Sequence, residues 1–295
     1  MEAENQIHPG TKRGVETVAN NHRLRRGMYV LPSLFTVGTL ICGYYAILST
    51  LRGAQVMAAG GTGALVSSSF DGAAIAIGLA IVFDGLDGRI ARLTNSTSNF
   101  GREFDSLADV ITFGLAPGIL AYSWGVRPAI EASQLPWTNH LRAIGWIVTF
   151  AYLICGAARL ARFNIDSVQP GVDRRFFIGL PIPAAAGVIA AVVHWQKDPI
   201  TYWPLALVWL IVTLGVAFLM VSRVRYYSFK ALDLRRRRSY VTIIFIGLII
   251  LAIFFYSETV LLILALTYAI SGLIHEIPGK SHSSNPPAAE EVKAQ

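Results

Sequence analysis

The chain has 295 residues, of which 54% are hydrophobic and only 15% are charged. A soluble protein averages about 25% charged residues, so this composition, with a mean hydropathy of +0.51, excludes an ordinary soluble domain. The formal net charge of +7 does not indicate a nucleic-acid partner, because the basic residues gather between apolar stretches, as they do in membrane proteins.

Apolar stretches close to the roughly 20 residues that cross a bilayer recur along the chain. They predict eight membrane-spanning helices, at about 28–51, 70–88, 105–125, 142–161, 178–196, 200–221, 240–257 and 259–275. The last two pairs are joined by very short turns, where two spans are hardest to tell from one. The predicted fold class is an all-α polytopic integral membrane protein.

Polar segments flank these spans. Residues 1–27 are basic and are expected to be mostly disordered or to lie on the membrane surface. Residues 222–239 form the most basic loop, and the tail 277–295 is rich in Ser, Pro, Ala and Glu and is expected to be disordered. Trp203 and Trp209 are expected to face lipid or the membrane interface.

The distribution of Lys and Arg predicts the orientation in the membrane. Eight spans place both termini on one side, and 21 of the 25 basic residues fall on that side. Only Arg52, Arg127, Arg142 and Lys197 fall on the other. Because basic residues are enriched in cytoplasmic loops, we expect a multi-pass protein of the cell (inner) membrane with both termini in the cytoplasm.

Four aspartates lie at the joints between the second and third predicted spans. Asp84 and Asp87 are three residues apart and Asp105 and Asp109 are four apart, so each pair shares one face of a helix. Four carboxylates that converge at a bilayer edge repel one another unless cations lie between them. Oxygen ligands favour Mg²⁺, Mn²⁺ or Ca²⁺ over zinc. The pattern therefore predicts a metal site at the cytoplasmic surface.

Two other interpretations of these acids remain open. Aspartates at helix ends are often caps, but Asp84 follows 73–83, eleven residues without a charge. Acids in membrane helices also mark ion pathways, which would make the chain a cation transporter. A transporter should carry acids in several spans, whereas here they gather in one pair of helices.

The surrounding residues suit a phosphorylated ligand. Gly88 and Gly101 lack side chains, which lets phosphate oxygens approach the backbone closely. The guanidinium of Arg92 can bind a diphosphate through two parallel hydrogen bonds. Arg159 and Arg162 share a helix face at the cytoplasmic end of the fourth span, where they either reach for lipid headgroups or bind an anionic group of a substrate.

The aspartate motif resembles a known pattern. Asp84-x-x-Asp87-Gly88-x-x-Ala91-Arg92, then eight residues, then Gly101-x-x-x-Asp105-x-x-x-Asp109 is similar to the signature of the CDP-alcohol phosphatidyltransferases, with every fixed position and spacing in agreement. The resemblance implies a six-helix catalytic core over about 28–221, followed here by two additional helices in 240–276. It also implies two divalent cations on the four aspartates, with Asp109 as the general base, and a homodimer.

Four further segments, 31–36, 159–164, 177–181 and 221–226, resemble one branch of that family, the CDP-diacylglycerol–serine O-phosphatidyltransferases. That branch transfers the phosphatidyl group of CDP-diacylglycerol to L-serine and releases CMP. The resemblance assigns CDP-diacylglycerol to Gly88, Ala91, Arg92, Ser98 and Gly101. For the serine carboxylate the expected partners are Arg159 or Arg162, with Asn164. A sister enzyme that uses glycerol 3-phosphate or inositol phosphate remains an alternative.

Overall fold

The computed structural model describes residues 12–61, 63–94, 99–133, 138–168, 176–227 and 240–275, which are almost entirely helical. The elements in chain order are α1 (Lys12–Ala58), α2 (Ala64–Thr94), α3 (Asn99–Asp109), the π-helix η1 (Val110–Leu115), α4 (Ala116–Gly125), α5 (Arg127–Ala132), α6 (Thr138–Val168), β1 (Phe176–Ile178), α7 (Ile182–Gln196), α8 (Trp203–Val221), β2 (Arg225–Tyr227) and α9 (Tyr240–His275). The predicted all-α class is confirmed, apart from two strands of three residues each.

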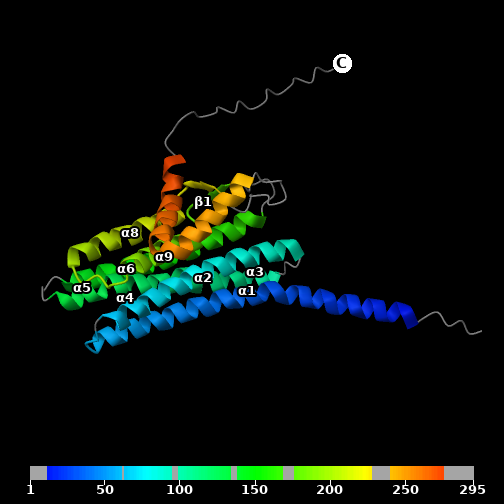
Figure 1. Cartoon of the computed structure of the whole chain (residues 1–295), viewed down its shortest axis with the longest axis horizontal. Coiled ribbons are helices and arrows are strands. Elements are labelled where there is room, and N and C mark those ends of the chain that lie inside the picture. Colours follow the sequence, from blue (N-terminus) through cyan, green and yellow to red (C-terminus); the bar gives the residue numbers. More distant parts are fainter. Residues whose placement is uncertain are drawn as a thin grey trace, which may run out of the picture.

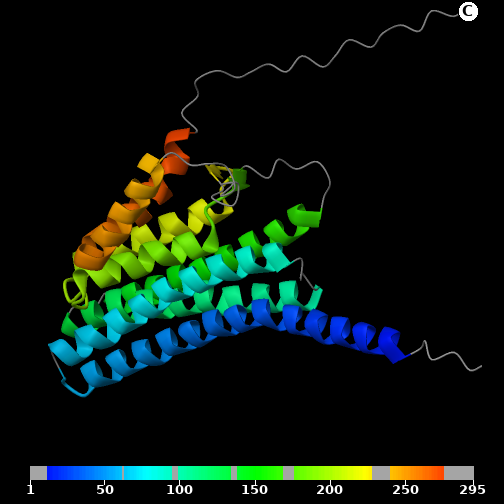
Figure 2. The same cartoon turned by 45° about the vertical axis from the view of Figure 1, so that its right-hand side comes forward.

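The long helices lie side by side in one bundle (Figures 1 and 2). Helices α1 and α2 form an antiparallel hairpin along one side, and α3, η1 and α4 follow as one nearly continuous rod. Helices α6, α8 and α9 lie on the other side of that rod. The C-terminal end of α2, the beginning of α3 and the end of α6 therefore meet at one end of the bundle, and the α1–α2 turn lies at the other.

Six stretches within the described residues are long and apolar enough to cross a membrane, which makes this a multi-pass membrane protein. They are Leu34–Ala58, Ala64–Ile90, Phe100–Ala132, Asn139–Ile165, Trp203–Val221 and Gly247–Leu273. Helix α7 is apolar but has only 15 residues. The predicted count of eight spans stays a prediction, because the fifth predicted span is this short helix and the last two fall within α9.

Helix α9 consists of two helical halves that meet at Tyr256. The backbone of Tyr256 has φ −135° and ψ 48°, outside the helical region. In both overall views the orange and red halves of α9 run in nearly opposite directions (Figures 1 and 2). We call α9 the C-terminal hairpin.

The N-terminal segment is helical from Lys12 onward. Of the two alternatives expected for residues 1–27, disorder does not hold for residues 12–27, which belong to helix α1, and a position on the membrane surface stays a prediction. Residues 225–227 of the predicted basic loop form β2. The remainder of that loop from residue 228, and the predicted tail 277–295, lie outside the described residues.

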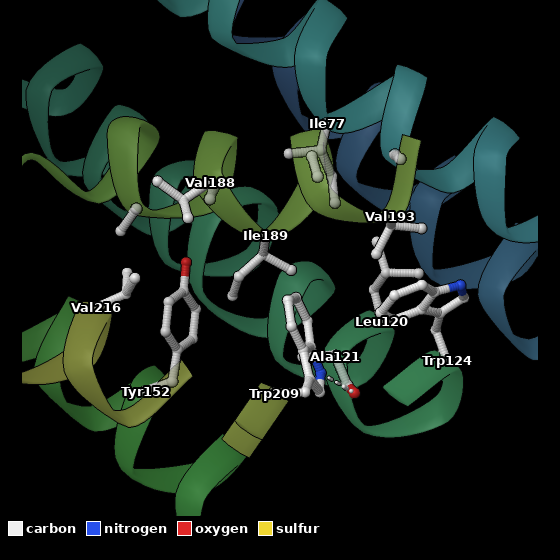
Figure 3. Packing of buried hydrophobic residues seen from close by; sticks show 14 of the residues in the cluster. Ile77, Leu120, Ala121, Trp124, Tyr152, Val188, Ile189, Val193, Trp209 and Val216 are labelled. Carbon is white, nitrogen blue, oxygen red and sulfur yellow. Dashed lines mark hydrogen bonds between the residues drawn. The ribbon is translucent and has the colours of Figure 1, made fainter. Parts of the chain in front are cut away.

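The core of the bundle is built on aromatic side chains and close helix contacts (Figure 3). The indole of Trp209 is only 4% exposed, and its Nε1 donates to the backbone oxygen of Ala121 at 2.9 Å. It meets Trp124 edge-on, with ring centroids 5.3 Å apart. The expectation that Trp209 faces lipid is therefore wrong. Helix α8 is apolar on every side, so its sequence does not indicate which face is buried.

A short β-ribbon lies at the end of the bundle where α2 ends and α3 begins. Strands β1 and β2 pair antiparallel, with Phe177 opposite Tyr226. After β1, Gly179 has φ +80°, and its N–H donates to the oxygen of Val224 at 2.8 Å. A Cβ at Gly179 would collide with the backbone oxygen of Met220. Only glycine suits this position, for both conformational and steric reasons.

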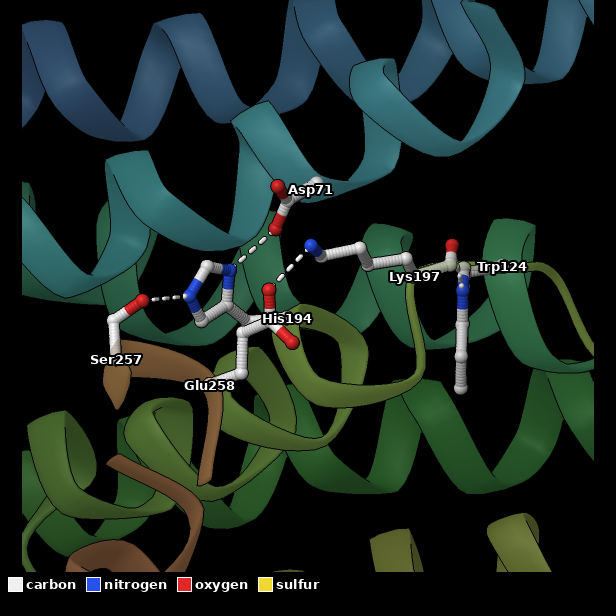
Figure 4. A network of polar contacts seen from close by, with 6 residues as sticks. All are labelled: Asp71, Trp124, His194, Lys197, Ser257 and Glu258. Carbon is white, nitrogen blue, oxygen red and sulfur yellow. Dashed lines mark hydrogen bonds and ion pairs between the residues drawn. The ribbon is translucent and has the colours of Figure 1, made fainter. Parts of the chain in front are cut away.

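Polar contacts hold the bend of the C-terminal hairpin at the opposite end of the bundle (Figure 4). His194 of α7 contacts the carboxylate of Asp71 through Nδ1 and the hydroxyl of Ser257 through Nε2 at 3.1 Å. Lys197 forms a hydrogen-bonded ion pair with Glu258. The hydrogen bond to Glu258 raises the pKa of Lys197 above its ordinary value. We call Asp71, His194, Lys197, Ser257 and Glu258 the polar clasp. It connects α2, α7 and α9.

Candidate active site

Three of the four aspartates come together where α2 approaches α3. Asp84 lies in the last third of α2, and Asp105 and Asp109 lie one turn apart on α3. One carboxylate oxygen from each of these residues lies within 4.8 Å of the others. Asp84 and Asp105 are half-buried, and Asp109 is only 8% exposed. We call these three residues the acid cluster.

Asp87 is held differently from the acid cluster and does not belong to that group of three. It is 6% exposed, and its Oδ2 accepts a hydrogen bond from the hydroxyl of Thr36 on α1. The interpretation of the sequence gave Thr36 no role. The sequence did offer one indication of this contact. Thr36 is a hydroxyl residue near the start of the first apolar stretch, and that start lies at the end of the bundle where the acids were expected.

The backbone after the acid cluster forms a π-helix, and two hydrogen bonds attach this π-helix to other helices. Asp109 is the last residue of α3, and the π-helix η1 begins at the next residue. Such wide turns often occur at functional sites. The hydroxyl of Tyr152 donates to the backbone oxygen of Phe113 at 2.9 Å, and that of Thr112 donates to the oxygen of Thr39 at 3.3 Å. These bonds connect η1, which directly follows Asp109, to α6 and α1.

The electrostatics of the acid cluster favour a bound cation. At 4.8 Å and an effective dielectric constant of about 20, each pair of ionised carboxylates repels by about 3.5 kcal/mol. A divalent cation among the three oxygens converts this repulsion into attraction. The donors are all carboxylate oxygens, which suit a hard ion such as Mg²⁺, Mn²⁺ or Ca²⁺. The residues therefore fit a divalent metal.

The residues expected to contact CDP-diacylglycerol are only partly described. Gly88 is exposed near the end of α2, and a Cβ there would meet no atom within 4 Å, so the space beside it is open to a ligand. Gly101 is half-buried in the first turn of α3. Ala91 and Arg92 belong to the end of α2, but their side chains lie outside the described part of the structure, as does the whole of Ser98.

The two arginines of α6 have different environments. Arg159 is 8% exposed, and its guanidinium lies 5.4 Å from the centre of the Phe163 ring. The charges of Asp109 and Asp84 are close enough to act on Arg159 electrostatically. Arg162 is exposed. Of the two, Arg159 is therefore the buried one, and the charges of the acid cluster act on it.

Asn164 connects α6 to α3. Its Nδ2 donates to the hydroxyl of Ser106 at 2.9 Å, and that hydroxyl donates to the backbone oxygen of Arg102 at 2.9 Å. Ser106 directly follows Asp105 in the chain. Asn164 thus supports α3, the helix that carries Asp105 and Asp109. From the sequence, Asn164 was expected to bind serine, and this contact was not predicted.

The fold and the site define a class of protein: a multi-pass membrane protein with a carboxylate site, suited to a divalent cation, at one end of its helical bundle. The profile of the CDP-alcohol phosphatidyltransferase family matches residues 29–221, which include the acid cluster, Asp87, Thr36 and Arg159. The chain belongs to this family.

Relatives from distant microorganisms carry one enzyme name, CDP-diacylglycerol–serine O-phosphatidyltransferase. The protein from Helicobacter pylori (strain ATCC 700392 / 26695) is 37% identical over 75% of this chain and 82% of its own length. The protein from Bacillus subtilis (strain 168) is 34% identical over 69% of this chain and 93% of its own. The protein from Methanocaldococcus jannaschii is 32% identical over 68% of this chain and 82% of its own length.

Proposed function

We propose that this chain is a CDP-diacylglycerol–serine O-phosphatidyltransferase. It transfers the phosphatidyl group of CDP-diacylglycerol to the hydroxyl of L-serine and releases CMP. The observation that supports this best is the convergence of Asp84, Asp105 and Asp109 within the segment that matches the family profile. The relatives named above support serine as the acceptor.

The reaction replaces a phosphoanhydride bond of the diphosphate with a phosphoester bond to serine. The serine oxygen attacks the phosphorus that carries diacylglycerol, and the bond from that phosphorus to the bridging oxygen breaks, so the oxygen leaves with CMP. We assign Asp109 as the general base that accepts the proton of the serine hydroxyl, in line with its place in the family motif and its burial at the acid cluster. Arg159 is our candidate for the serine carboxylate.

Divalent cations complete the proposed site. Asp84, Asp105 and Asp109, with Asp87 oriented by Thr36, would hold two ions, Mg²⁺ or Mn²⁺, and Ca²⁺ is also able to occupy oxygen sites of this kind. When bound, such ions neutralise the diphosphate and stabilise the departing CMP. Gly88, Ala91, Arg92, Ser98 and Gly101 would contact the nucleotide and diphosphate, as the family motif implies.

The location follows from the same proposal. Serine is dissolved in water, whereas the acyl chains of CDP-diacylglycerol stay in the bilayer, so a site at the membrane surface can reach both substrates. We place the protein in the cell (inner) membrane, with both termini and the active site on the cytoplasmic side, because 21 of its 25 basic residues fall on that side of the predicted topology. We expect a homodimer, as in the family it belongs to.

An acceptor assay tests this function. Purified protein in detergent is given CDP-diacylglycerol with Mn²⁺ or Mg²⁺, and serine, glycerol 3-phosphate and inositol phosphate are offered separately. We expect CMP release with serine alone. Asp109→Asn should abolish it, whereas Glu103→Gln, an exposed acid on the same helix, should not. Release with another acceptor would overturn serine as the substrate, and no release from folded protein with any acceptor would overturn the transferase.

A further inference from the structure

The π-helix η1 begins at the residue after Asp109 and joins α3, which carries Asp105 and Asp109, to α4. Where η1 ends, the N–H of Ala116 bonds to the oxygen of Ile111, five residues earlier instead of the four of an α-helix. Such a turn holds one extra residue, and one residue corresponds to about 100° of rotation in an α-helix of 3.6 residues per turn. The conformation of η1 therefore decides how α3 is rotated relative to α4.

A proline and a buried tyrosine explain why an α-helix is disfavoured here. Pro117, the second residue of α4, has no N–H, so it cannot donate the bond that an α-helix would direct from this position to the oxygen of Phe113. The hydroxyl of Tyr152, which lies in the core (Figure 3), donates to that oxygen instead, at 2.9 Å. Tyr152 and Phe113 are both fully buried, so bulk water would not replace a lost donor. The hydroxyl thus supplies a hydrogen bond that Pro117 cannot make.

Helices α1 and α6 pack closely against η1. On the α1 side, Thr112 donates to the oxygen of Thr39 at 3.3 Å, and a Cβ at Gly43 would overlap Thr112. On the α6 side, a Cβ at Gly114 would lie 2.9 Å from the side chain of Leu153, which is too close. Packed protein interiors transmit strain and leave few voids, so a change in the winding of η1 would disturb both neighbours. The two helices therefore hold η1 in one conformation.

The three carboxylates of the acid cluster come from two helices, and their oxygens lie within 4.8 Å of one another. A rotation of α3 would carry Asp105 and Asp109 away from Asp84. We propose that Tyr152 is a positioning residue for the divalent-cation site: its hydroxyl holds η1 in the π form, and η1 keeps the two acids of α3 turned toward Asp84. This inference rests on the proposed function, because it takes the acid cluster as the site of the cations.

The test measures Mn²⁺ binding to the full chain in detergent, without substrates, from the electron paramagnetic resonance signal of free Mn²⁺. Tyr152→Phe keeps the ring and loses only the hydroxyl. We expect its Kd for Mn²⁺ to rise about three- to tenfold, because a cation that binds only the π form must restore that form against the loss of one buried hydrogen bond. Tyr122→Phe, which removes the hydroxyl of a half-buried tyrosine on α4, should bind Mn²⁺ as the wild type does.

A second variant acts on the same backbone oxygen from within the rod of α3, η1 and α4. Pro117→Ala introduces an N–H that can pair with the oxygen of Phe113 in an α-helix, so the α form competes better with the π form. We expect the Kd for Mn²⁺ to rise in this variant as well. If Tyr152→Phe does not fold, Pro117→Ala decides the question by the same measurement.

Each other result overturns the inference. An unchanged Kd in folded Tyr152→Phe, with a lower melting temperature in chelator, means that the hydroxyl only stabilises the core. An unchanged Kd in Pro117→Ala means that the conformation of η1 does not control the acids. If the wild type itself binds no Mn²⁺, the cation site of the proposed function fails and this inference fails with it, whereas equal binding by the wild type and both variants defeats this inference alone.

Discussion

Neutralising one carboxylate of the acid cluster should stabilise the metal-free protein and weaken its response to divalent cations. The substitution Asp105→Asn keeps the shape of the side chain and removes two of the three repelling pairs. At 4.8 Å and a dielectric constant of about 20 these two pairs amount to about 7 kcal/mol of gross repulsion. Proton uptake and local water reduce this, and we expect a net gain of about 1–3 kcal/mol in the free energy of unfolding.

The response to cations should change in the opposite direction. A cation that binds only the folded protein stabilises it by about 2.7 kcal/mol when its concentration is 100 times its Kd. The wild type in detergent should therefore show a rise in melting temperature with Mn²⁺ or Mg²⁺ after treatment with a chelator. In Asp105→Asn we expect the cation concentration at half-effect to rise at least about tenfold, because one of the three carboxylate ligands is lost.

Glu103→Gln is the matched control, because it removes one negative charge from an exposed position on the same helix. It should leave both the metal-free stability and the cation response near those of the wild type. The reasoning is refuted if metal-free Asp105→Asn is less stable than the wild type and still responds to cations at the same concentration. An equal shift in both variants would show that total charge, not the acid cluster, sets the response.

Three further substitutions test contacts that position the site. Thr36→Val should lower the rate of CMP release and cost about 1–3 kcal/mol of stability, because it leaves an oxygen of buried Asp87 without its hydroxyl donor. Ser257→Ala removes the 3.1 Å contact with His194 and should lower the melting temperature by the equivalent of about 1 kcal/mol, with CMP release retained. Gly179→Ala should destabilise the protein by more than about 2 kcal/mol, since its φ is +80° and the added Cβ has no room.

Controls for these three use the same measurements of CMP release and thermal unfolding in detergent. Thr36→Ser should restore the activity lost in Thr36→Val, because it restores the hydroxyl. Gly247→Ala should be neutral, since a Cβ at this helical glycine meets no atom within 4 Å. A Thr36→Val protein with full activity, or a Gly179→Ala protein as stable as Gly247→Ala, would contradict the contacts inferred here.

Local sequence patterns predicted the class of the protein and the existence of its site. Long apolar runs require helices in a bilayer, because no other open structure satisfies its backbone hydrogen bonds there. The spacings of Asp84 with Asp87 and of Asp105 with Asp109 place each pair on one helix face, whatever the rest of the chain does. These properties depend only on residues close together in the sequence, and so the all-α membrane class and the family resemblance were predictable.

Tertiary packing decided which of these residues work together. Helices that are apolar on most sides carry no pattern that indicates their neighbours, so the burial of Trp209 could not be predicted from its surroundings in the chain. The same holds for the hydrogen bond that joins Asp87 to Thr36, 51 residues earlier.

Alone, the sequence determined a helical membrane protein with an acidic, metal-suited motif of the CDP-alcohol phosphatidyltransferase kind. Only the tertiary structure grouped Asp84 with Asp105 and Asp109 and distinguished buried Arg159 from exposed Arg162. The physical reason is distance along the chain. Periodicity determines which face of a helix a residue occupies, but the contacts between helices depend on the shapes of side chains that meet only after the bundle has assembled.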